Sequence, residues 1–240
     1  ATTNNDPAAI ASPPMRWRTE TVGSLVIDDP FARGCVNELL QALPPLRCAA
    51  TCFAPIGSNT MAIGATIHTF EVQLAHIDRA VYEELTLRVA RHPSETDAYM
   101  MTRVLAYCLE YEEGITFAEG GVSSTDEPAV LVRDMTGHIT AWIEIGAPDA
   151  ARLHFGSKLA DRTAIYTHRD PAKLLNAWAG KTIHRAAEIP VRSFDPGFIE
   201  SATQAIARRN AMSVSVTEGQ LYLTLNGLNL ESSIHEQYLA

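Results

Sequence analysis

Regular alternation of apolar and polar side chains begins only after Met61. Apolar residues occupy every second position in 70–74 and again in 85–89. A period of two is typical of strands, in which successive side chains point to opposite faces. The pattern therefore predicts two strands that are joined through residues 76–79.

A helix is predicted next, from Ser94 to about Leu109. Pro93 precedes Ser94, and Asp97 follows it three positions later. This is a variant of the capping box in which Ser94 is the N-cap residue. Apolar residues of this segment then recur at the spacing of one helical face, namely Met101, Val104, Leu105 and Cys108.

The rest of the chain alternates between short strands and helices. Strands are predicted around 115–117, 129–133, 139–145, 163–168 and 188–194. Helices are predicted over 148–159, 170–180 and 195–209, and a hairpin over 212–227 turns at Glu218 and Gly219. Because the strand at 163–168 follows a helix, a parallel crossover is expected there. The predicted fold class is α/β, a central mixed sheet flanked by helices, in one domain over 61–240.

Residues 1–60 do not follow this pattern. They hold three of the four cysteines and scattered prolines, with little periodicity. We expect a poorly ordered N-terminal extension, tag-like or wrongly included, upstream of a natural start at Met61. The alternative is a genuine but weakly folded N-terminal arm.

Composition narrows the class of partner. The formal charge is −9, whereas a protein that coats nucleic acid needs a basic face. The chain has no apolar run of about 18 residues that would span a membrane, and its first residues lack the pattern of a secretory signal. A cytoplasmic protein with free thiols is expected. The absence of a phosphate-binding GxxxxGK loop disfavours an NTPase.

The first candidate chemistry lies at the ends of the predicted hairpin. Asp126 and Glu127 precede one strand, and Glu144 lies near the end of its neighbour. These ends are adjacent in an antiparallel pair, so two carboxylates could meet there and bind a divalent cation, which prefers oxygen ligands. On spacing alone, an ordinary turn followed by a solvated strand residue is the favoured interpretation. Glu144 shares a strand face with Trp142, which makes full solvation of its carboxylate less expected.

The two flanking helices supply further candidates. Glu95 and Asp97 fall in the first turn of the helix after Ser94, where helix capping and the helix dipole already explain an acid. Arg152 and Lys158 lie on the helix after the hairpin, and a phosphoryl site needs such a cation to stabilise charge on the phosphate. A solvated helix face with ion pairs is the alternative for both.

The stretches ARHPSETD (90–97), DEPA (126–129) and WIEIG (142–146) together resemble the YaeQ family of small bacterial proteins. The resemblance is close over 62–170 and extends by length and order to 240. It implies a variation on the PD-(D/E)XK restriction-endonuclease-like fold. In that fold the motif acids would be Glu95 or Asp97 on the helix, Asp126 or Glu127 on the first strand, and Glu144 on the second.

The cation of the motif is displaced in this sequence. The lysine position is Gly146, and Ala147 stands where the family commonly has glutamine. Nuclease-like folds can carry the lysine on the following helix, so the resemblance makes Lys158, and less so Arg152, the candidate replacement.

Three functional hypotheses follow from the resemblance and the residues. The first is a nuclease-like phosphodiesterase in which Mg²⁺ or Mn²⁺ bound by Glu144 and Asp126 or Glu127 activates water. The second is a non-catalytic module that binds nucleic acid or a transcription-associated protein. The third is a different metal-dependent hydrolase that uses the same acids on a small phosphate ester.

Overall fold

The computed structural model describes residues 64–118 and 127–239. The chain divides into two units, Ala1–Ser58 and Asn59–Ala240, and all described residues belong to the second unit. The expectation for residues 1–60 therefore lies outside the described residues.

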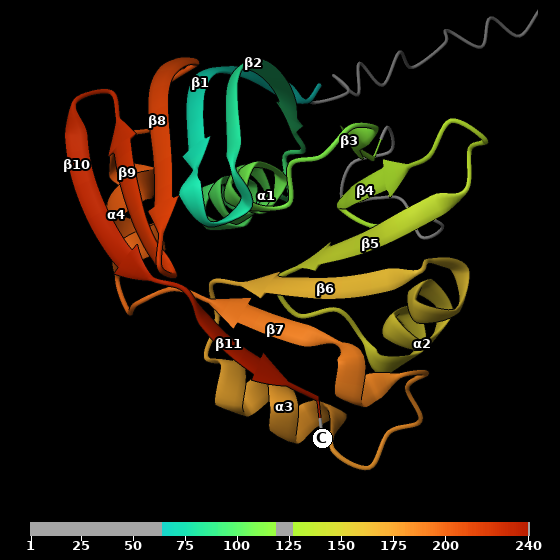
Figure 1. Ribbon diagram of the computed structural model, residues 1–240. Coiled ribbons are helices and arrows are strands. Elements are labelled where there is room, and N and C mark those ends of the chain that lie inside the picture. Colours follow the sequence, from blue (N-terminus) through green and yellow to red (C-terminus); the bar gives the residue numbers. More distant parts are fainter. Residues whose placement is uncertain (1–63, 119–126, 240) are drawn as a thin grey trace, which may run out of the picture. The chain divides into compact units, whose positions relative to one another are not determined.

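The described residues form two mixed β-sheets with helices (Figure 1). The first sheet has the strand order β10-β9-β8-β1-β2. Its strands are β1 (Thr66–His76), β2 (Val81–Arg91), β8 (Arg209–Thr217), β9 (Gln220–Leu225) and β10 (Leu228–Ser233). The second sheet has the order β11-β7-β6-β5-β4-β3. Its strands are β3 (Ile115–Phe117), β4 (Val130–Arg133), β5 (Ile139–Ile145), β6 (Arg162–Thr167), β7 (Pro190–Ser193) and β11 (His235–Tyr238).

The α-helices are α1 (Asp97–Leu109), α2 (Ala150–Leu159), α3 (Pro171–Trp178) and α4 (Phe198–Gln204), and short 3-10 turns occur at Ile77–Arg79 and Ala186–Glu188. The mixed α/β class is confirmed, but two sheets replace the single central sheet that was expected. The reason is topological: β1 pairs with the C-terminal β8 as well as with β2, so these two strands form a sheet with β8, β9 and β10 and not with the strands that follow them in the chain.

Helix α1 is the element that both sheets share. Nine of its thirteen residues are buried, and one apolar core combines its side chains with residues of both sheets, such as Phe70 of β1 and Ile143 of β5. Helix α1 also contacts α4, and Figure 1 shows both helices against the same face of the first sheet. A helix this deeply buried is stabilised by tertiary packing more than by its own propensity.

The other face of the second sheet is covered by α2 and α3. Leu153 of α2, Leu174 of α3 and Ile165 of β6 belong to a second apolar cluster there. Helix α2 connects β5 to β6, which pair in parallel, so the expected crossover is confirmed. The connection places the carboxyl ends of β5 and β6 side by side, and ligand sites of parallel strands commonly lie at such ends.

Two helix boundaries differ from the prediction. The N-cap of α1 is Thr96, whose Oγ1 accepts a hydrogen bond from the Tyr99 amide at 3.1 Å. The hydroxyl of Ser94 instead pairs with His92 Nδ1 at 2.6 Å, so the predicted cap was wrong by two residues. Helix α4 ends at Gln204 rather than at residue 209.

The early end of α4 follows from a side chain that competes with the helix. Asn210 Oδ1 accepts a hydrogen bond from the Ala207 amide at 2.7 Å, and its Nδ2 donates to the Ala207 carbonyl at 2.9 Å. Asparagine side chains that bind nearby backbone groups favour loops over helix interiors. The segment before β8 is therefore held as a turn.

The prediction omitted the last two strands. Strand β10 has only one fully buried residue, Ser232, and all four residues of β11 are exposed. Strand β11 shows no apolar alternation, and in β10 only Leu228 and Leu230 alternate with polar residues, because each strand pairs at a sheet edge rather than within a core. Within the described residues, no helix is long and apolar enough to cross a membrane.

The close contact between Gly114, directly before β3, and the backbone of β4 can be tested by substitution. The φ of Gly114 is +87°, and a Cβ there would lie 2.0 Å from the carbonyl oxygen of Arg133. We expect Gly114→Ala to lower the free energy of unfolding by about 3 kcal/mol or more, because it adds a backbone clash to left-handed strain. Gly137→Ala is the matched control, since Gly137 has φ +85° and no neighbour within 4 Å. We expect it to cost only about 1 kcal/mol in urea unfolding; equal losses would contradict the clash.

Candidate functional site

Glu144 lies near the end of β5 on the face that α2 covers, and it is only 3% exposed. Trp142 is two residues earlier on the same face, and its Nε1 donates a hydrogen bond to Glu144 Oε1 at 2.7 Å. Arg152 of α2 donates to the same oxygen through Nε at 2.6 Å. The carboxylate thus points toward α2 and is held by two donors.

The start of α2 determines where Arg152 lies. Asp149 is the N-cap residue, and its Oδ1 accepts a hydrogen bond from the Arg152 amide at 2.7 Å. The Arg152 side chain then reaches across the sheet, and its Nη2 donates to the Glu127 carbonyl at 2.5 Å. Arg152 therefore joins the segment before β4 to the end of β5.

Packing of the indole brings α2 close to the strand. A Cβ on Gly156 would lie 2.5 Å from the Trp142 ring, so only glycine allows this approach. Phe155 contacts the same ring edge-on, with 5.9 Å between centroids. The Glu144 carboxylate is consequently enclosed by Trp142, Arg152 and the backbone of α2.

Burial dominates the electrostatics of Glu144. Desolvation raises the pKa of this carboxyl above its usual value, while Arg152 and the Trp142 hydrogen bond oppose the rise. A buried carboxylate with a single cationic partner is expensive to ionise, because the interior solvates charge poorly. The pair is therefore sensitive to the loss of either member.

Glu127 is the one predicted ligand before β4 that lies within the described residues. Its carboxylate pairs with Arg133 Nη2 at 2.9 Å, and its backbone carbonyl accepts a hydrogen bond from Arg152, which also binds Glu144. Asp126 lies outside the described residues. Among residues 64–118 and 127–239, no three His, Cys, Asp or Glu side chains are grouped so as to hold a metal ion.

The two acids predicted on the helix also have structural partners. Glu95 is 4% exposed and forms an ion pair with Arg103 at 2.8 Å. Burial raises the pKa of Glu95, and Arg103 opposes this. Asp97 lies at the surface and pairs with Arg91 at 3.0 Å. The structure accordingly places neither acid in contact with Glu144.

Helix α1 instead brings Tyr99 toward the end of β5. Burial, with the nearby Glu144 charge as the next cause, raises the pKa of Tyr99 to about 12. Thr102, one turn later, lies 3.4 Å from His168 Nδ1 through its hydroxyl. Neither Tyr99 nor His168 was predicted from the sequence as a residue of this site. The amphipathic pattern of α1 does place Tyr99 one turn before the buried residue Arg103.

Gly146 is the residue at which the motif implied by the resemblance would carry its lysine. Its φ is +79°, and its amide donates to the Tyr166 carbonyl at 2.8 Å. A Cβ there would point at Tyr99 and His168, at 3.6 and 3.8 Å. Any L-residue at this position is strained by the left-handed backbone.

The two candidate replacements for the motif lysine, Arg152 and Lys158, differ in their contacts. Arg152 is committed to Glu144 and Glu127, as described above. Lys158 lies in the last turn of α2 and is exposed. Within the described part of the chain, Lys158 has no ion-pair partner, and it does not contact Glu144.

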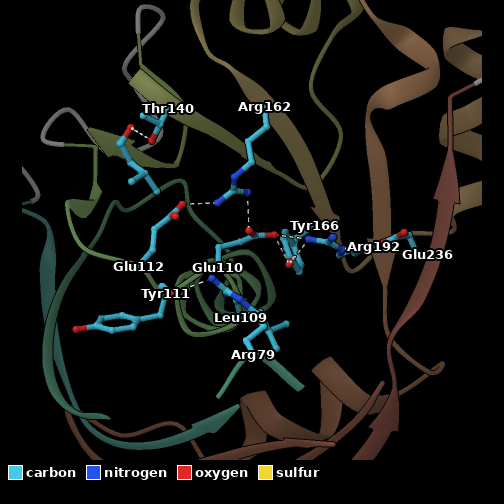
Figure 2. Close-up of polar contacts among 11 residues, drawn as sticks. Arg79, Leu109, Glu110, Tyr111, Glu112, Thr140, Arg162, Tyr166, Arg192 and Glu236 are labelled. Carbon is cyan, nitrogen blue, oxygen red and sulfur yellow. Dashed lines mark hydrogen bonds and ion pairs between the residues drawn. The ribbon is translucent and has the colours of Figure 1, made fainter. Parts of the chain in front are cut away.

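A second polar centre was not predicted at all. Glu110 caps the carboxyl end of α1 and is buried. Figure 2 shows its carboxylate between Arg162, Tyr166 and Arg192. Arg162 Nη1 donates at 2.6 Å, the Tyr166 hydroxyl donates at 2.7 Å, and Arg192 Nη1 donates to the same oxygen as Tyr166.

The partners of Glu110 continue the network to the surface. Arg162 also binds Glu112, and Arg192 Nε binds Glu236 of β11 at 2.8 Å. Arg79 donates to the carbonyls of Leu109 and Tyr111 at 2.6 and 3.1 Å, which satisfies groups left open at the helix end. Figure 2 shows these contacts converging on the end of α1.

Electrostatics distinguish this centre from Glu144. Desolvation would raise the pKa of Glu110, but Arg192, Arg162 and the Tyr166 hydroxyl outweigh it, so the pKa is lowered. The only sequence signal was weak: Arg162 directly precedes the buried strand predicted at 163–168, and it shares a face with Tyr166 only if that strand begins one residue earlier, as β6 does. A charged residue on such a face requires a partner.

Comparisons with known proteins converge on one family. The family model described as YaeQ protein matches residues 61–234. A Salmonella typhi protein is 30% identical over 174 residues, which make up 71% of this chain and 94% of that relative. An Escherichia coli K12 protein is 29% identical over 177 residues, or 72% of this chain and 96% of that relative. Both relatives are named "Uncharacterized protein YaeQ".

Solved structures agree with the sequence relatives. The crystal structure of YaeQ from Xanthomonas axonopodis pv. citri matches with a TM-score of 0.66 and 26% identity, over 73% of this chain and 99% of that chain. YaeQ from Pseudomonas syringae matches with a TM-score of 0.64 and 29% identity, over 73% and 96% respectively. The arrangement of two mixed sheets and four helices over the described residues matches these structures.

The lowered pKa of Glu110 predicts a specific acid sensitivity. The ionised group stabilises the fold above its unfolded value near 4.5, and this contribution is lost as the pH falls through the lower folded value. We expect Glu110→Gln to cost about 2–4 kcal/mol at pH 7 and to flatten the loss of unfolding free energy between about pH 5 and 3.

Urea unfolding at a series of pH values measures both effects of Glu110→Gln. Glu236→Gln is the control, because it removes a partly exposed partner of the same Arg192 and is expected to cost less than about 1 kcal/mol. A Glu110→Gln variant with the wild-type steepness in acid would contradict the assignment.

Proposed function

The chain belongs to the YaeQ family, and we propose that it is a non-catalytic binding module on a nuclease-like fold. The observation that carries this proposal is the Arg152–Glu144 pair, in which an arginine occupies the carboxylate that a metal would need. An arginine held at 2.6 Å by Nε and also anchored to the Glu127 carbonyl is part of the architecture.

The order of elements supports the nuclease-like relation. A helix, an antiparallel run of strands, a crossover helix and a parallel strand follow one another as α1, β3–β5, α2 and β6. The PD-(D/E)XK architecture that the resemblance implies consists of a helix, a central mixed sheet, a second helix and a strand, in the same order. We propose the relation on topology and on the position of Glu144 near the end of β5.

Mg²⁺ or Mn²⁺ does not fit the described residues at this position. These ions take several oxygen ligands and favour one or two carboxylates, but Glu144 is held by Arg152 and Trp142, and the Glu127 carboxylate is held by Arg133. Gly146 supplies no cation for a phosphate, and Lys158 lies exposed in the last turn of α2. We therefore derive no metal-dependent step from this centre.

The charge of the chain favours a protein ligand over extended nucleic acid. A formal charge of −9 repels the phosphate backbone, whose neutralisation supplies most non-specific nucleic-acid affinity. We propose a protein partner, of which the transcription-associated protein implied by the resemblance is one case. Binding of this kind needs no metal and no ionised Glu144.

A metal-dependent phosphodiesterase is the second candidate. One observation favours it: Glu144 is a buried carboxyl with a raised pKa, close to Tyr99, and perturbed acids of this kind gather at functional sites. It requires Arg152 to leave Glu144, and it would act on nucleic acid or on a small phosphate ester.

Cleavage assays separate the two candidates. We expect the full chain to give no cleavage of DNA, RNA or a nitrophenyl phosphodiester with Mg²⁺ or Mn²⁺ above the rate of an identically purified Glu144→Gln variant. Metal-dependent cleavage that the variant loses would establish the phosphodiesterase instead. Lys173→Ala serves as a control, because Lys173 is an exposed lysine of α3 that neither candidate function places in the site.

Metal binding by an Arg152→Ala variant gives a second measurement. Removing Arg152 leaves Glu144 buried without its cation, which should cost about 3 kcal/mol of stability, and Glu144→Gln in the same chain should recover much of this loss. We expect calorimetry to detect no Mn²⁺ binding to wild type or to folded Arg152→Ala. Tight, Glu144-dependent Mn²⁺ binding to either protein would show a latent metal site.

The proposed binding of a protein partner can be tested directly. With a purified bacterial transcription complex as the probe, we expect association that survives EDTA and is unchanged in Glu144→Gln. Labelled duplex DNA and single-stranded RNA at physiological salt are expected to show no saturable binding. Nucleic-acid binding that requires added metal would count against a non-catalytic protein-binding module.

A further inference from the structure

Among the strands of the described residues, β2 is a long edge strand of the first sheet, and none of them pairs with its outer side. It spans eleven residues, Val81–Arg91, and pairs with β1 in one unbroken antiparallel register. The opposite edge of this sheet, β10, is covered in part, because Asp195 accepts a hydrogen bond from the Ser233 amide at 2.8 Å. In the second sheet the edge strands β3 and β11 have only three and four residues.

The backbone pattern shows which groups of β2 point outward. The Thr69 amide donates to Arg208, so odd-numbered residues of β1 face β8 and even-numbered ones face β2. The even-numbered residues of β1 pair with odd-numbered residues of β2, as His76 does with Val81. Even-numbered residues of β2 therefore turn their amides and carbonyls away from β1. The Ala90 carbonyl agrees, since it accepts from Arg103 Nη2 at 3.0 Å.

The sequence of β2 is self-complementary about Thr86. Read outward from Thr86, Leu85 mirrors Leu87, and Glu84 mirrors Arg88 with the opposite charge. If a second copy of β2 runs antiparallel with Thr86 opposite Thr86, each Glu84 lies opposite Arg88 of the other copy. All three of these even-numbered positions present outward backbone groups, so the register that pairs the charges is also the one that closes the hydrogen-bond ladder.

The side chains are available for this pairing. Glu84, Thr86 and Arg88 are exposed on one face of the sheet. Within the described residues, neither Glu84 nor Arg88 has an ion-pair partner. Strand β2 also contains no proline or lysine, the residues that commonly protect a free edge.

We propose that two copies of this chain associate edge to edge through β2, about a two-fold axis at Thr86. The two first sheets then form one continuous antiparallel sheet across the dimer. A two-fold contact requires a surface that complements itself, and the mirrored charges meet that requirement. Two Glu84–Arg88 pairs per dimer fix the register, because a shift by two residues would place Glu84 and Arg88 opposite uncharged residues instead of opposite each other.

Charge exchange tests the proposal on the full chain. Sedimentation over a range of concentrations should show a reversible monomer–dimer equilibrium for wild type. Glu84→Arg alone and Arg88→Glu alone each place like charges opposite at two positions, so each should weaken dimerisation at least about tenfold. The double variant Glu84→Arg with Arg88→Glu restores both pairs and should return to the wild-type association constant.

A matched control and a backbone variant complete the test. Glu231→Arg makes the same charge change on exposed β10 and should leave association unchanged. Thr86→Pro removes an outward amide that β1 does not use, so circular dichroism should show a folded protein that is monomeric. A wild type that stays monomeric at every concentration overturns the proposal. So does a dimer that is indifferent to Thr86→Pro, or one that the double variant fails to restore.

Discussion

The buried carboxylate of Glu110 fastens the end of α1 to the second sheet, and the remaining architecture depends on that attachment. Helix α1 contributes to a core that it shares with both sheets, so its position decides how strands distant in sequence share one core. Two arginines and a tyrosine surround the carboxylate. The charges of the two arginines and the hydrogen bond from the tyrosine lower the pKa of Glu110 despite its burial, which an apolar residue at the same place would not require. The network therefore links the end of α1 to β6 and β7.

Glu144 presents the opposite balance on the other face of the same sheet. It has one arginine and one indole donor, and burial prevails over both. Both centres pair a buried carboxylate with arginine. The partners of Glu110 outweigh the cost of burying its charge, whereas the partners of Glu144 do not. Arg152 explains why the second centre persists, since it satisfies Glu144 and simultaneously ties the segment before β4 to α2. The pair is thus a structural contact that joins three segments of the second sheet and its covering helix.

Sequence patterns predicted those features that depend on local periodicity. The alternation at 70–74 and 139–145 located β1 and β5, and the shared face of Trp142 and Glu144 followed from the same period. Thr96 could not be distinguished from Ser94, because both residues are good caps and the choice depends on where His92 lies. Strand β11 could not be predicted, because an exposed edge strand leaves no apolar signature. The Glu110 network joins residues up to 82 positions apart, and nothing in one sequence indicates such pairings.

The conformation of Gly146 has a consequence for how the molecule can change. A lysine at this position would have to adopt the left-handed backbone, which residues other than glycine rarely do. Its Cβ would make only ordinary contacts with Tyr99 and His168, so the obstacle lies in the backbone and not in the neighbouring side chains. A substitution at residue 146 alone therefore cannot place an unstrained lysine at the end of β5; the backbone after the strand would have to follow another path as well.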